Sequence, residues 1–312
     1  MTVRLGTRGS ALALAQAGRV RDAVVALGEP CELVPVTTAG DVSRASLAQI
    51  GGTGVFAGAL RSALLAGVVD LVVHSFKDLP VAPEPGLVVA GVPEREDARD
   101  VLCARDGATL DSLPAGAVVG TGSPRRVAQL VDRRPDLAVV DLRGNVDTRL
   151  SRVGRDLDAV VLSWAGLARL DRLDAATDAL PLETWPTAAG QGALALEVRE
   201  ADADPATPLG AIVAGLTDPV ALDAAVAERR VLGLLEAGCA APIGVASEIG
   251  ADRGALWASV HRPGGGERLD RRRETTFRPG ERGRALLAAA EALARDLLDA
   301  GAASLAPLGA IA

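Results

Sequence analysis

The chain has few residues of several types, and each shortage excludes a class of protein. Its three cysteines, Cys31, Cys103 and Cys239, lie far apart, and it has two histidines. An odd, scattered set of cysteines argues against a disulfide framework and suits a reducing compartment. Without metal-ligand spacing we expect no metal site. No apolar run reaches the ~18–20 residues that a membrane span needs, and residues 1–5 lack the apolar segment of a signal peptide. We therefore expect a soluble cytoplasmic protein with no membrane partner.

Lysine and the aromatic residues are also scarce. Lys77 is the only lysine, so 32 of the 33 basic residues are arginine, and tyrosine is absent. Where a positive charge only needs solvation, arginine serves as well as lysine, but it cannot replace a compact ammonium. With 40 acidic residues the net charge is −7. This acidic balance argues against a general nucleic-acid partner.

Apolar residues make up 49% of the 312 positions, and strand and helix patterns alternate from the start. The length predicts two or three domains. We expect strands at 3–6, 32–36 and 70–73, a helix capped by Ser10, and a helix over 56–66. Such βαβ alternation predicts a parallel sheet with helices on both faces. The polar, glycine-rich residues 38–54 predict a flexible loop.

A second α/β pattern follows the highly charged residues 93–100, which suit a hinge or domain boundary. Its expected strands are 117–120, 138–142 and 159–162, and its expected helices are 124–132, 146–153 and 167–180. Residues 193–198 form a strand that we expect to rejoin the first sheet. Beyond 219 we expect a helix at 221–235, strands at 243–249, 255–261 and 267–276, and a helix at 281–298.

These patterns predict an α/β protein with two doubly wound lobes and a small C-terminal α/β domain. Lobe 1 is discontinuous and comprises residues 1–96 and 193–216, lobe 2 comprises 97–192, and the C-terminal domain comprises 217–312.

Polar residues follow the strand at 70–73, and ligands of open sheets bind beyond the carboxyl ends of strands. The sequence HSFKDLP places Lys77 beside Asp78 there. A carboxylate near a cation can stabilise a cationic intermediate or move a proton. The alternative is an ordinary turn or helix cap. We interpret His74 as a hydrogen-bonded core histidine rather than a ligand.

The sequence GTGSPRR at 120–126 combines the end of a strand with two hydroxyl residues, a proline and two arginines. A proline at the first helical position, free backbone N–H groups and the helix dipole favour an anion, and arginine forks bind carboxylates or phosphates. The alternative is a plain strand–helix turn whose arginines face solvent. The phosphate-loop pattern is absent, so a nucleotide is not favoured.

Arginines recur at two other strand ends. Arg143 and Arg149 flank the start of the helix in DLRGNVDTR, and Arg8 and Ser10 follow the first strand. Alone, each arginine is more often a solvated surface charge. Together they predict a cleft between the lobes for a ligand with many carboxylates.

Cys239 lies among small residues in GCAAPIG, which predicts a tight turn. A cysteine there is a candidate nucleophile or attachment point. The alternative is a small buried residue, which is our interpretation of Cys31 and Cys103. No His–Asp pair lies nearby in the sequence, which argues against a cysteine hydrolase.

Taken together, these segments resemble the porphobilinogen deaminase family, also called hydroxymethylbilane synthases. The matching segments run in order from residue 5 to about 244, and include LGTRGSALALAQA, VVHSFKDLP, VGTGSPRRVAQL, LRGNVDTRL and EAGCAAPIG. The resemblance implies two lobes like those of periplasmic binding proteins. It implies a monomeric, cytoplasmic transferase that condenses four porphobilinogen molecules head to tail into hydroxymethylbilane and releases ammonia. The chain grows on a covalent dipyrromethane primer.

The resemblance also implies a role for each motif residue. Cys239 carries dipyrromethane through a thioether, and Asp78 is the catalytic carboxylate that stabilises the azafulvene cation and the protonated pyrrole nitrogens. The other primer-binding residues are Lys77, Thr121, Ser123, Arg125 and Arg126. The residues that bind the acetate and propionate groups of the substrate are Arg8, Ser10, Gln16, Arg143, Arg149 and Arg169.

The sequence departs from the family at three places. Lysines common in the family's GGxGxF loop are replaced at Thr53 and Gly58, Phe76 is larger than the usual residue, and Gly122 replaces a common serine. An alternative function is a non-catalytic two-lobed protein that binds a small anion. Cys239 discriminates between the two, because a binding protein needs no primer.

Overall fold

The computed structural model describes residues 2–37, 57–238 and 241–308. The chain forms two compact units. Unit 1 comprises Met1–Arg95 and Ala193–Ala225, and unit 2 comprises Glu96–Gly192 and Val226–Ala312. Unit 2 thus contains residues of both the predicted second lobe and the predicted C-terminal domain, and the division into three domains stays a prediction.

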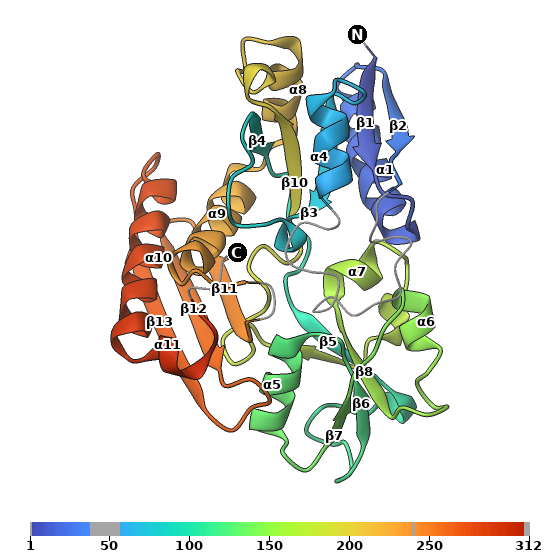
Figure 1. The fold of residues 1–312 in the computed structure, drawn as a ribbon, viewed down its shortest axis with the longest axis vertical. Coiled ribbons are helices and arrows are strands. Elements are labelled where there is room, and N and C mark those ends of the chain that lie inside the picture. The colour runs from blue at the N-terminus through green and yellow to red at the C-terminus, as the bar shows by residue number, and fades with distance from the viewer. Residues whose placement is uncertain (1, 38–56, 239–240, 309–312) are drawn as a thin grey trace. The chain divides into compact units, whose positions relative to one another are not determined.

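Unit 1 is built on a five-stranded sheet with the order β2-β1-β3-β10-β4 (Figure 1). The strands are β1 (Val3–Thr7), β2 (Cys31–Pro35), β3 (Leu71–Ser75), β4 (Leu87–Gly91) and β10 (Leu194–Arg199). Strand β1 pairs in parallel with β2 and β3, whereas β10 is antiparallel to both β3 and β4. The predicted return of the chain to the first sheet is confirmed, but the sheet is mixed rather than purely parallel.

Helices cover both faces of this sheet, as the βαβ pattern predicts. Alternate residues of a strand point to opposite faces, so Leu71 and Val73 of β3 pack with α1 (Ala11–Ala26) and α8 (Pro208–Leu216). Val72 packs on the other face with α4 (Gly58–Leu65). Two 3-10 turns complete the unit, η1 (Phe76–Asp78) and η4 (Glu200–Asp202).

Unit 2 begins with a second five-stranded sheet, of order β7-β6-β8-β5-β9. Its strands are β5 (Asp100–Ala104), β6 (Val118–Gly120), β7 (Ala138–Val140), β8 (Ala159–Ser163) and β9 (Asp178–Leu180). Strand β6 is parallel to β7 and β8, and β5 is antiparallel to β8 and β9. The two sheets share one topology, in which β1, β2 and β3 correspond to β6, β7 and β8. Equivalent strand ends therefore carry the candidate site residues of both units.

The helical elements of this sheet are α5 (Pro124–Arg133), α6 (Val146–Leu150), α7 (Trp164–Ala168), η2 (Arg105–Gly107) and η3 (Leu173–Ala175). The predicted helix over 167–180 is wrong. Helix α7 ends at Ala168, Asp171 takes a left-handed φ of 54°, and the chain then enters strand β9. The left-handed residue breaks the helical hydrogen-bond pattern, and pairing with β5 determines the conformation of the last three residues.

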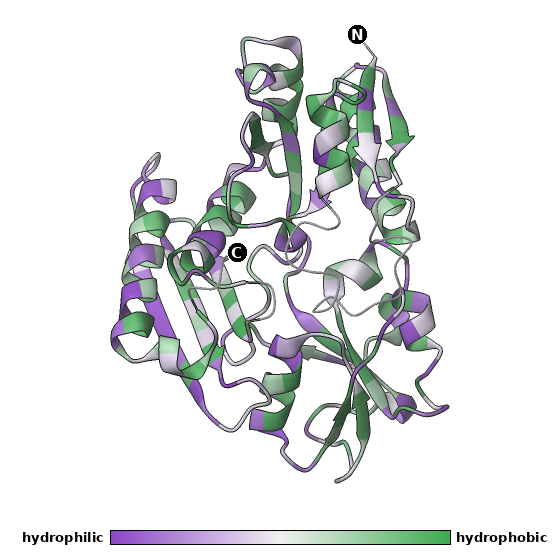
Figure 2. Ribbon diagram, in the orientation of Figure 1, coloured by the Kyte–Doolittle hydropathy of each residue, from purple (hydrophilic) through white to green (hydrophobic). Residues whose placement is uncertain are grey.

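The C-terminal residues of unit 2 form an antiparallel sheet of β11 (Ile243–Ile249), β12 (Arg253–His261) and β13 (Arg268–Thr276). Helix α9 (Pro219–Leu234) precedes this sheet in the chain, and α10 (Arg282–Asp299) and α11 (Ala302–Leu305) follow it. Leu256, Ala258 and Val260 of β12 form the core with α10. In Figure 2 β13 is largely hydrophilic, and α10 carries both hydrophilic and hydrophobic residues. The intervening residues of β12 point to the opposite face, where His261 meets α5.

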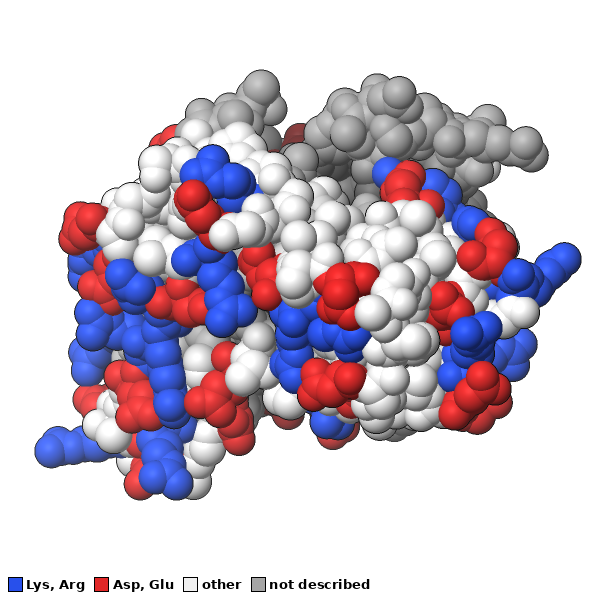
Figure 3. All heavy atoms as spheres, turned by 90° about the horizontal axis from the view of Figure 1, so that it is seen from below, with Lys and Arg blue, Asp and Glu red and all other residues white. Residues whose placement is uncertain are grey.

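Charges of both signs lie interspersed on the face drawn in Figure 3. This pattern suits a surface that remains in water. Among the described residues no single helix has the length and apolar composition to cross a membrane, whereas α8 and α9 pass that test only as a pair bent by 88°.

Candidate active site

In unit 1 the candidate residues follow β1 and β3, whose carboxyl ends lie at one edge of the sheet because the strands are parallel. Ser10 caps α1, as predicted, by accepting a hydrogen bond from the Ala13 amide at 3.3 Å. The buried Gln16 of α1 donates from Nε2 to Ser75 Oγ at 2.9 Å. This contact ties α1 to the end of β3. Arg8 is half-buried beside the cap.

Lys77 and Asp78 lie in the turn η1, directly after β3. The turn is fixed by its apolar members, because Phe76 and Leu79 are buried and the Phe76 amide donates to the Ala193 carbonyl at 3.1 Å. Lys77 is half-buried and Asp78 is exposed. A rigid turn therefore presents the Asp78 carboxylate to solvent and to any ligand.

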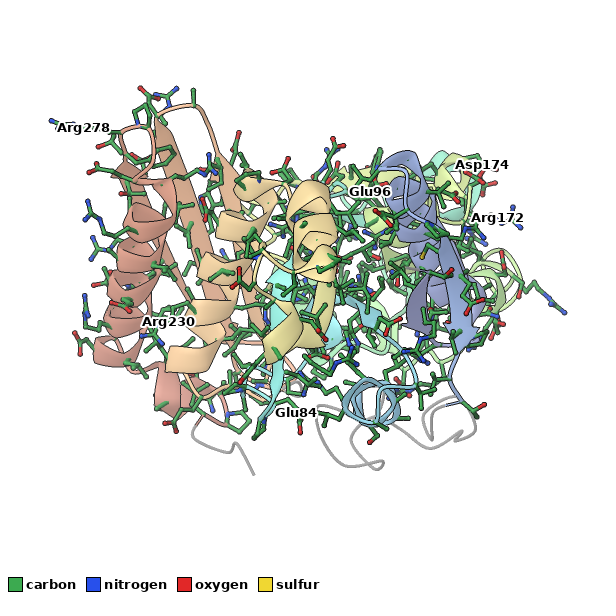
Figure 4. The ribbon with its side chains drawn as sticks, turned by 90° about the horizontal axis from the view of Figure 1, so that it is seen from above. Glu84, Glu96, Arg172, Asp174, Arg230 and Arg278 are labelled. Atoms are coloured by element: carbon green, nitrogen blue, oxygen red, sulfur yellow. The ribbon has the colours of Figure 1, made fainter. Side chains whose placement is uncertain are left out.

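Beneath this turn lies a buried ion network. His74 Nε2 is 3.0 Å from Glu197 Oε2, and Arg61 Nη2 is 2.9 Å from Glu197 Oε1. Arg61 also reaches Glu84, labelled in Figure 4, at 3.1 Å. Burial opposes the ionisation of Glu197, but the hydrogen bonds from His74 and Arg61 outweigh it and hold the pKa of Glu197 below its usual value. The interpretation of His74 as a core histidine is confirmed.

In unit 2 the end of β6 leads into α5, which begins at Pro124 as predicted, and the Ser123 hydroxyl caps the helix. Ser123 accepts from the Arg126 amide at 3.5 Å, with Pro124 at the start of the helix, and Thr121 is buried. A Cβ atom on Gly122 would lie 2.7 Å from the Leu142 carbonyl oxygen. That backbone contact explains why a glycine stands here instead of a serine.

Arg125 and Arg126 do not face solvent, because both are buried against Asp100 of β5. Arg125 Nη2 lies 2.8 Å from Asp100 Oδ2, and Arg126 Nη2 lies 2.6 Å from Asp100 Oδ1. Trp185 Nε1 and Gln191 Nε2 donate to the same carboxylate at 3.0 and 2.8 Å. Burial raises the pKa of Asp100, but the two arginines outweigh it and hold that pKa far below its usual value. Asp100 was not expected at the site, because it lies in the charged segment 93–100 that suits a hinge or domain boundary.

Arg149 of α6 interacts electrostatically with two other predicted site residues, Arg126 and Arg143. Burial lowers the pKa of Arg149, and the charges of Arg126 and Arg143 lower it further. Its Nε donates to the Gly144 carbonyl at 2.8 Å. Arg143 is exposed and lies 3.3 Å from Asp141. The charges of Arg126 and Arg143 thus act on Arg149 within unit 2, and the cleft for a ligand with many carboxylates stays a prediction.

Arg126 also has an unsatisfied donor. Its Nη1 donates to the Val161 carbonyl at 2.9 Å, but its buried Nε finds no hydrogen-bond partner among the described residues. A buried donor without a partner is costly. With the neighbouring like charges, this orphan donor fits an anionic group such as a carboxylate.

One predicted residue, Arg169, makes a contact that the sequence did not indicate. Arg169, next to the end of α7, is buried and donates from Nη2 to the Gly192 carbonyl at 2.6 Å. Cys239 lies outside the described residues, as does the whole predicted loop 38–54, which includes Thr53.

The other cysteines are poor nucleophiles. Cys103 is buried, as interpreted, and burial raises its pKa to about 12. Cys31 is only half-buried, and burial raises its pKa to about 11. Only a thiolate is a strong nucleophile, so neither residue competes with Cys239 as an attachment point.

Comparisons with known proteins agree with these motifs. The family model described as porphobilinogen deaminase, dipyromethane cofactor binding domain, matches residues 3–207. A porphobilinogen deaminase of Leifsonia xyli subsp. xyli is 57% identical over 98% of this chain and 94% of its own. One from Thermobifida fusca is 51% identical over 96% of this chain and 94% of its own.

Among solved structures, a periplasmic substrate-binding protein from Coxiella burnetii aligns with a TM-score of 0.43 and 16% identity, over 73% of this chain and 96% of that one. The methionine-binding protein MetQ aligns with a TM-score of 0.44 and 14% identity, over 73% of this chain and 94% of that one. The family match and the identities of 51–57% over nearly the whole length establish the relationship. The chain belongs to the porphobilinogen deaminase family.

Proposed function

We propose that this chain carries out its family's reaction with Asp78 of unit 1 as the catalytic carboxylate and the arginines of unit 2 as carboxylate-binding residues. Family membership makes the chain a transferase, a hydroxymethylbilane synthase, with porphobilinogen as substrate and dipyrromethane as cofactor. The reaction joins four porphobilinogen molecules head to tail and releases one ammonia from each.

The cluster of Arg126, Arg143 and Arg149 is the observation that carries this proposal. Like charges raise each other's free energy, as the lowered pKa of Arg149 reflects. An anion relieves that repulsion, and arginine forks match carboxylates. Each porphobilinogen brings an acetate and a propionate group. A growing chain of such units supplies the negative charge that the cluster lacks.

The residues present fit the dipyrromethane cofactor, because the buried Arg126 Nε has no hydrogen-bond partner in the described part of the chain, and a carboxylate would provide one. We assign its thioether to Cys239 and its side-chain contacts to Lys77, Thr121, Ser123, Arg125 and Arg126. Bound there, dipyrromethane supplies the pyrrole carbon to which the first substrate unit is joined. Substrate carboxylates are assigned to Arg8, Ser10, Gln16, Arg143, Arg149 and Arg169.

The contacts of Gln16 and Arg169 indicate how each of these two residues would act in the substrate site. Gln16 holds the Ser75 hydroxyl at 2.9 Å, so it acts by orienting the end of β3. Arg169 holds the Gly192 carbonyl at 2.6 Å, and so supports the chain where it leaves unit 2. Both residues are buried.

Asp78 has the chemistry and exposure that the reaction requires. When the aminomethyl C–N bond breaks, ammonia leaves with the electron pair and an azafulvenium cation remains on the substrate. A carboxylate beside that cation lowers its free energy and can accept the proton that the joined pyrrole then loses. The turn η1 fixes the main chain of Asp78 while leaving its side chain exposed.

Two variants test the assignments separately. Asp78→Ala is expected to abolish turnover while preserving both the fold and the mass of the dipyrromethane adduct, since Asp78 is exposed. Cys239→Ser is expected to lose that adduct, measured by intact mass and by Ehrlich's reagent. Near-normal turnover of Asp78→Ala rejects its role, and a primed, active Cys239→Ser protein rejects the attachment site.

We further propose that the protein acts as a cytoplasmic monomer without a nucleic-acid or membrane partner, in keeping with its scattered cysteines and net charge of −7. Sedimentation of the purified protein tests the monomer. The alternative of a non-catalytic anion-binding protein has no observation in its favour. An unmodified intact mass together with absent turnover would revive it.

A further inference from the structure

We propose that Asp100 is a positioning residue for the reaction, which fixes the tandem arginines of α5 where they bind carboxylates of the cofactor. The proposal rests on the function proposed above for Arg125 and Arg126. Asp100 is the first residue of β5 and is paired with Ser163 of β8 and Leu180 of β9. It therefore lies inside the sheet, on a backbone held from both sides.

The Asp100 carboxylate is saturated with hydrogen bonds. Oδ1 accepts from Arg126 Nη2 at 2.6 Å and from Gln191 Nε2 at 2.8 Å. Oδ2 accepts from Arg125 Nη2 at 2.8 Å and from Trp185 Nε1 at 3.0 Å. A carboxylate has about four acceptor positions, and all are used. Asp100 is 0% exposed, so it cannot move a proton to or from a ligand, and its role is to hold other groups.

The four donors come from two separate segments of unit 2. Arg125 and Arg126 begin α5, whereas Trp185 and Gln191 lie on the segment that leads to the end of this part of the unit. One carboxylate thus joins three parts of the chain, β5, α5 and residues 185–191. Because buried ion pairs require exact geometry to offset desolvation, this arrangement leaves the two guanidinium groups little freedom.

The charge balance of the cluster favours a ligand. Two guanidinium groups face one carboxylate, so one positive charge is left over. The charge of Arg126 acts on Arg149 of the candidate site, because it contributes to the lowered pKa of Arg149. Asp100 holds Arg126 by Nη2 and the Val161 carbonyl holds it by Nη1, which leaves Nε for a carboxylate. Without Asp100, we expect this donor to lose its fixed direction.

The test compares Asp100→Asn with Asp70→Asn as a matched control. Asp70 also accepts from an arginine, with Arg4 Nη2 at 2.6 Å from Oδ1, and is nearly buried, but it belongs to no proposed site. Both variants lose a carboxylate from an ion pair. We expect only Asp100→Asn to be purified largely without the dipyrromethane adduct by intact mass, and to show kcat per primed molecule lowered by about 10- to 100-fold.

Asp100→Glu provides the second variant, in case Asp100→Asn does not fold. It keeps the charge but moves the carboxylate by one methylene, so a role in positioning predicts loss of primer from a folded protein. Overpacking by one methylene lowers stability, and thermal unfolding measures that loss separately from the loss of primer. A folded Asp100→Glu or Asp100→Asn protein with normal adduct and normal kcat overturns the proposal.

Arg126→Leu separates this proposal from the proposed function on which it rests. If Arg126→Leu keeps its adduct and its kcat, the role of Arg126 in the proposed function fails. If Arg126→Leu loses both while folded Asp100 variants lose neither, only the positioning role of Asp100 fails. If Arg126→Leu and the folded Asp100 variants all lose the adduct and kcat, the results support both the role of Arg126 and the positioning role of Asp100.

Discussion

Gln129 of α5 donates from Nε2 to the main-chain oxygen of Pro186 at 2.9 Å. The same oxygen accepts from Arg125 Nη1 at 3.2 Å. Strand β11 lies on the other side of this segment, because the Val245 amide donates to the Thr187 carbonyl at 2.7 Å. The adjacent carbonyls of Pro186 and Thr187 therefore link the helix that bears the tandem arginines to the strand that follows Cys239.

Gly244 makes this link possible, which gives the first prediction. A Cβ atom at Gly244 would lie 2.3 Å from the Pro186 carbonyl oxygen. Because that oxygen belongs to the main chain, the contact can be relieved only by a shift of backbone. We expect Gly244→Ala to lower the free energy of unfolding by about 1–3 kcal/mol. We also expect a smaller primed fraction by intact mass, since β11 and α5 are pushed apart.

Gly18→Ala is the matched control. Gly18 lies within α1, and a Cβ atom there meets nothing within 4 Å. Alanine in place of a helical glycine stabilises by about 0.5–1 kcal/mol. The two substitutions should therefore shift the unfolding temperature in opposite directions. Equal shifts would mean that the contact between Gly244 and Pro186 does not constrain the protein.

The second prediction concerns Glu197 and acid stability. The unfolded carboxyl titrates near 4.5, and its pKa in the folded protein is lower. As pH falls below about 4.5, the unfolded state binds the proton first, so stability is lost, with a limiting slope of about 1.4 kcal/mol per pH unit. Glu197→Gln should remove the part of the slope below pH 4.5 that Glu197 contributes, and leave the part that Asp100 and Asp70 contribute.

Glu197→Gln should also cost about 3–5 kcal/mol at neutral pH, because it removes the buried partner of Arg61. Urea unfolding at several pH values measures both effects. A variant with wild-type slope below pH 4.5 would show that the buried network with His74 does not set the acid limit. Asp70→Asn, which removes a different carboxylate of unit 1, serves as the comparison.

Local signals in the sequence predicted much of this fold. The cap at Ser10 was recognisable because a small hydroxyl residue preceded an apolar helical period, and its side chain accepts the expected amide. The start of α5 was recognisable because proline is favoured at the first helical position. The strand at 193–198 was recognisable because its short, mostly apolar sequence ALALEV predicts a buried strand. These features depend on neighbours within a few residues, which a sequence displays directly.

The contacts of Asp100 could not be predicted in the same way. Its partners lie 25 to 91 residues away in the chain, and nothing in the charged run around it distinguishes a buried carboxylate from a solvated one. For the same reason Arg125 and Arg126 were expected at a ligand rather than against a strand. Leu167, Leu170 and Leu173 mimic a helical period, but Asp171 breaks it.

The third prediction concerns His261 and a higher pH range. His261 Nδ1 lies 2.5 Å from Asp132 Oδ2 of α5, and Nε2 lies 2.6 Å from Ser259 Oγ. Burial lowers the pKa of His261, and the contact with Asp132 offsets this only in part. As pH falls below about 6.5, the unfolded histidine binds a proton first, so stability is again lost on acidification.

His261→Gln should therefore flatten the dependence of unfolding free energy on pH just below 6.5 while leaving the Glu197 range below 4.5 unchanged. Because the effect of Glu197→Gln is expected below pH 4.5 and that of His261→Gln just below pH 6.5, each variant serves as a control for the other. Unfolding in urea between pH 4 and 8 measures the effect. If His261→Gln leaves the slope below pH 6.5 intact, another group is responsible for it.

The last prediction concerns Lys77, the only lysine in the chain. It lies in a turn whose neighbours Phe76 and Leu79 are buried, so its main chain cannot shift to accept a larger head group. An ammonium is a compact charge, whereas a guanidinium is a planar fork. We expect Lys77→Arg to fold normally yet to lower kcat/KM by about 10- to 100-fold, because it displaces charge beside Asp78. Arg172→Lys, at an exposed ion pair with Asp147 at 3.0 Å (Arg172 is labelled in Figure 4), should leave kcat/KM unchanged. If Lys77→Arg retains full activity, the chain keeps its single lysine there for reasons unrelated to the reaction, and the compact ammonium is not required.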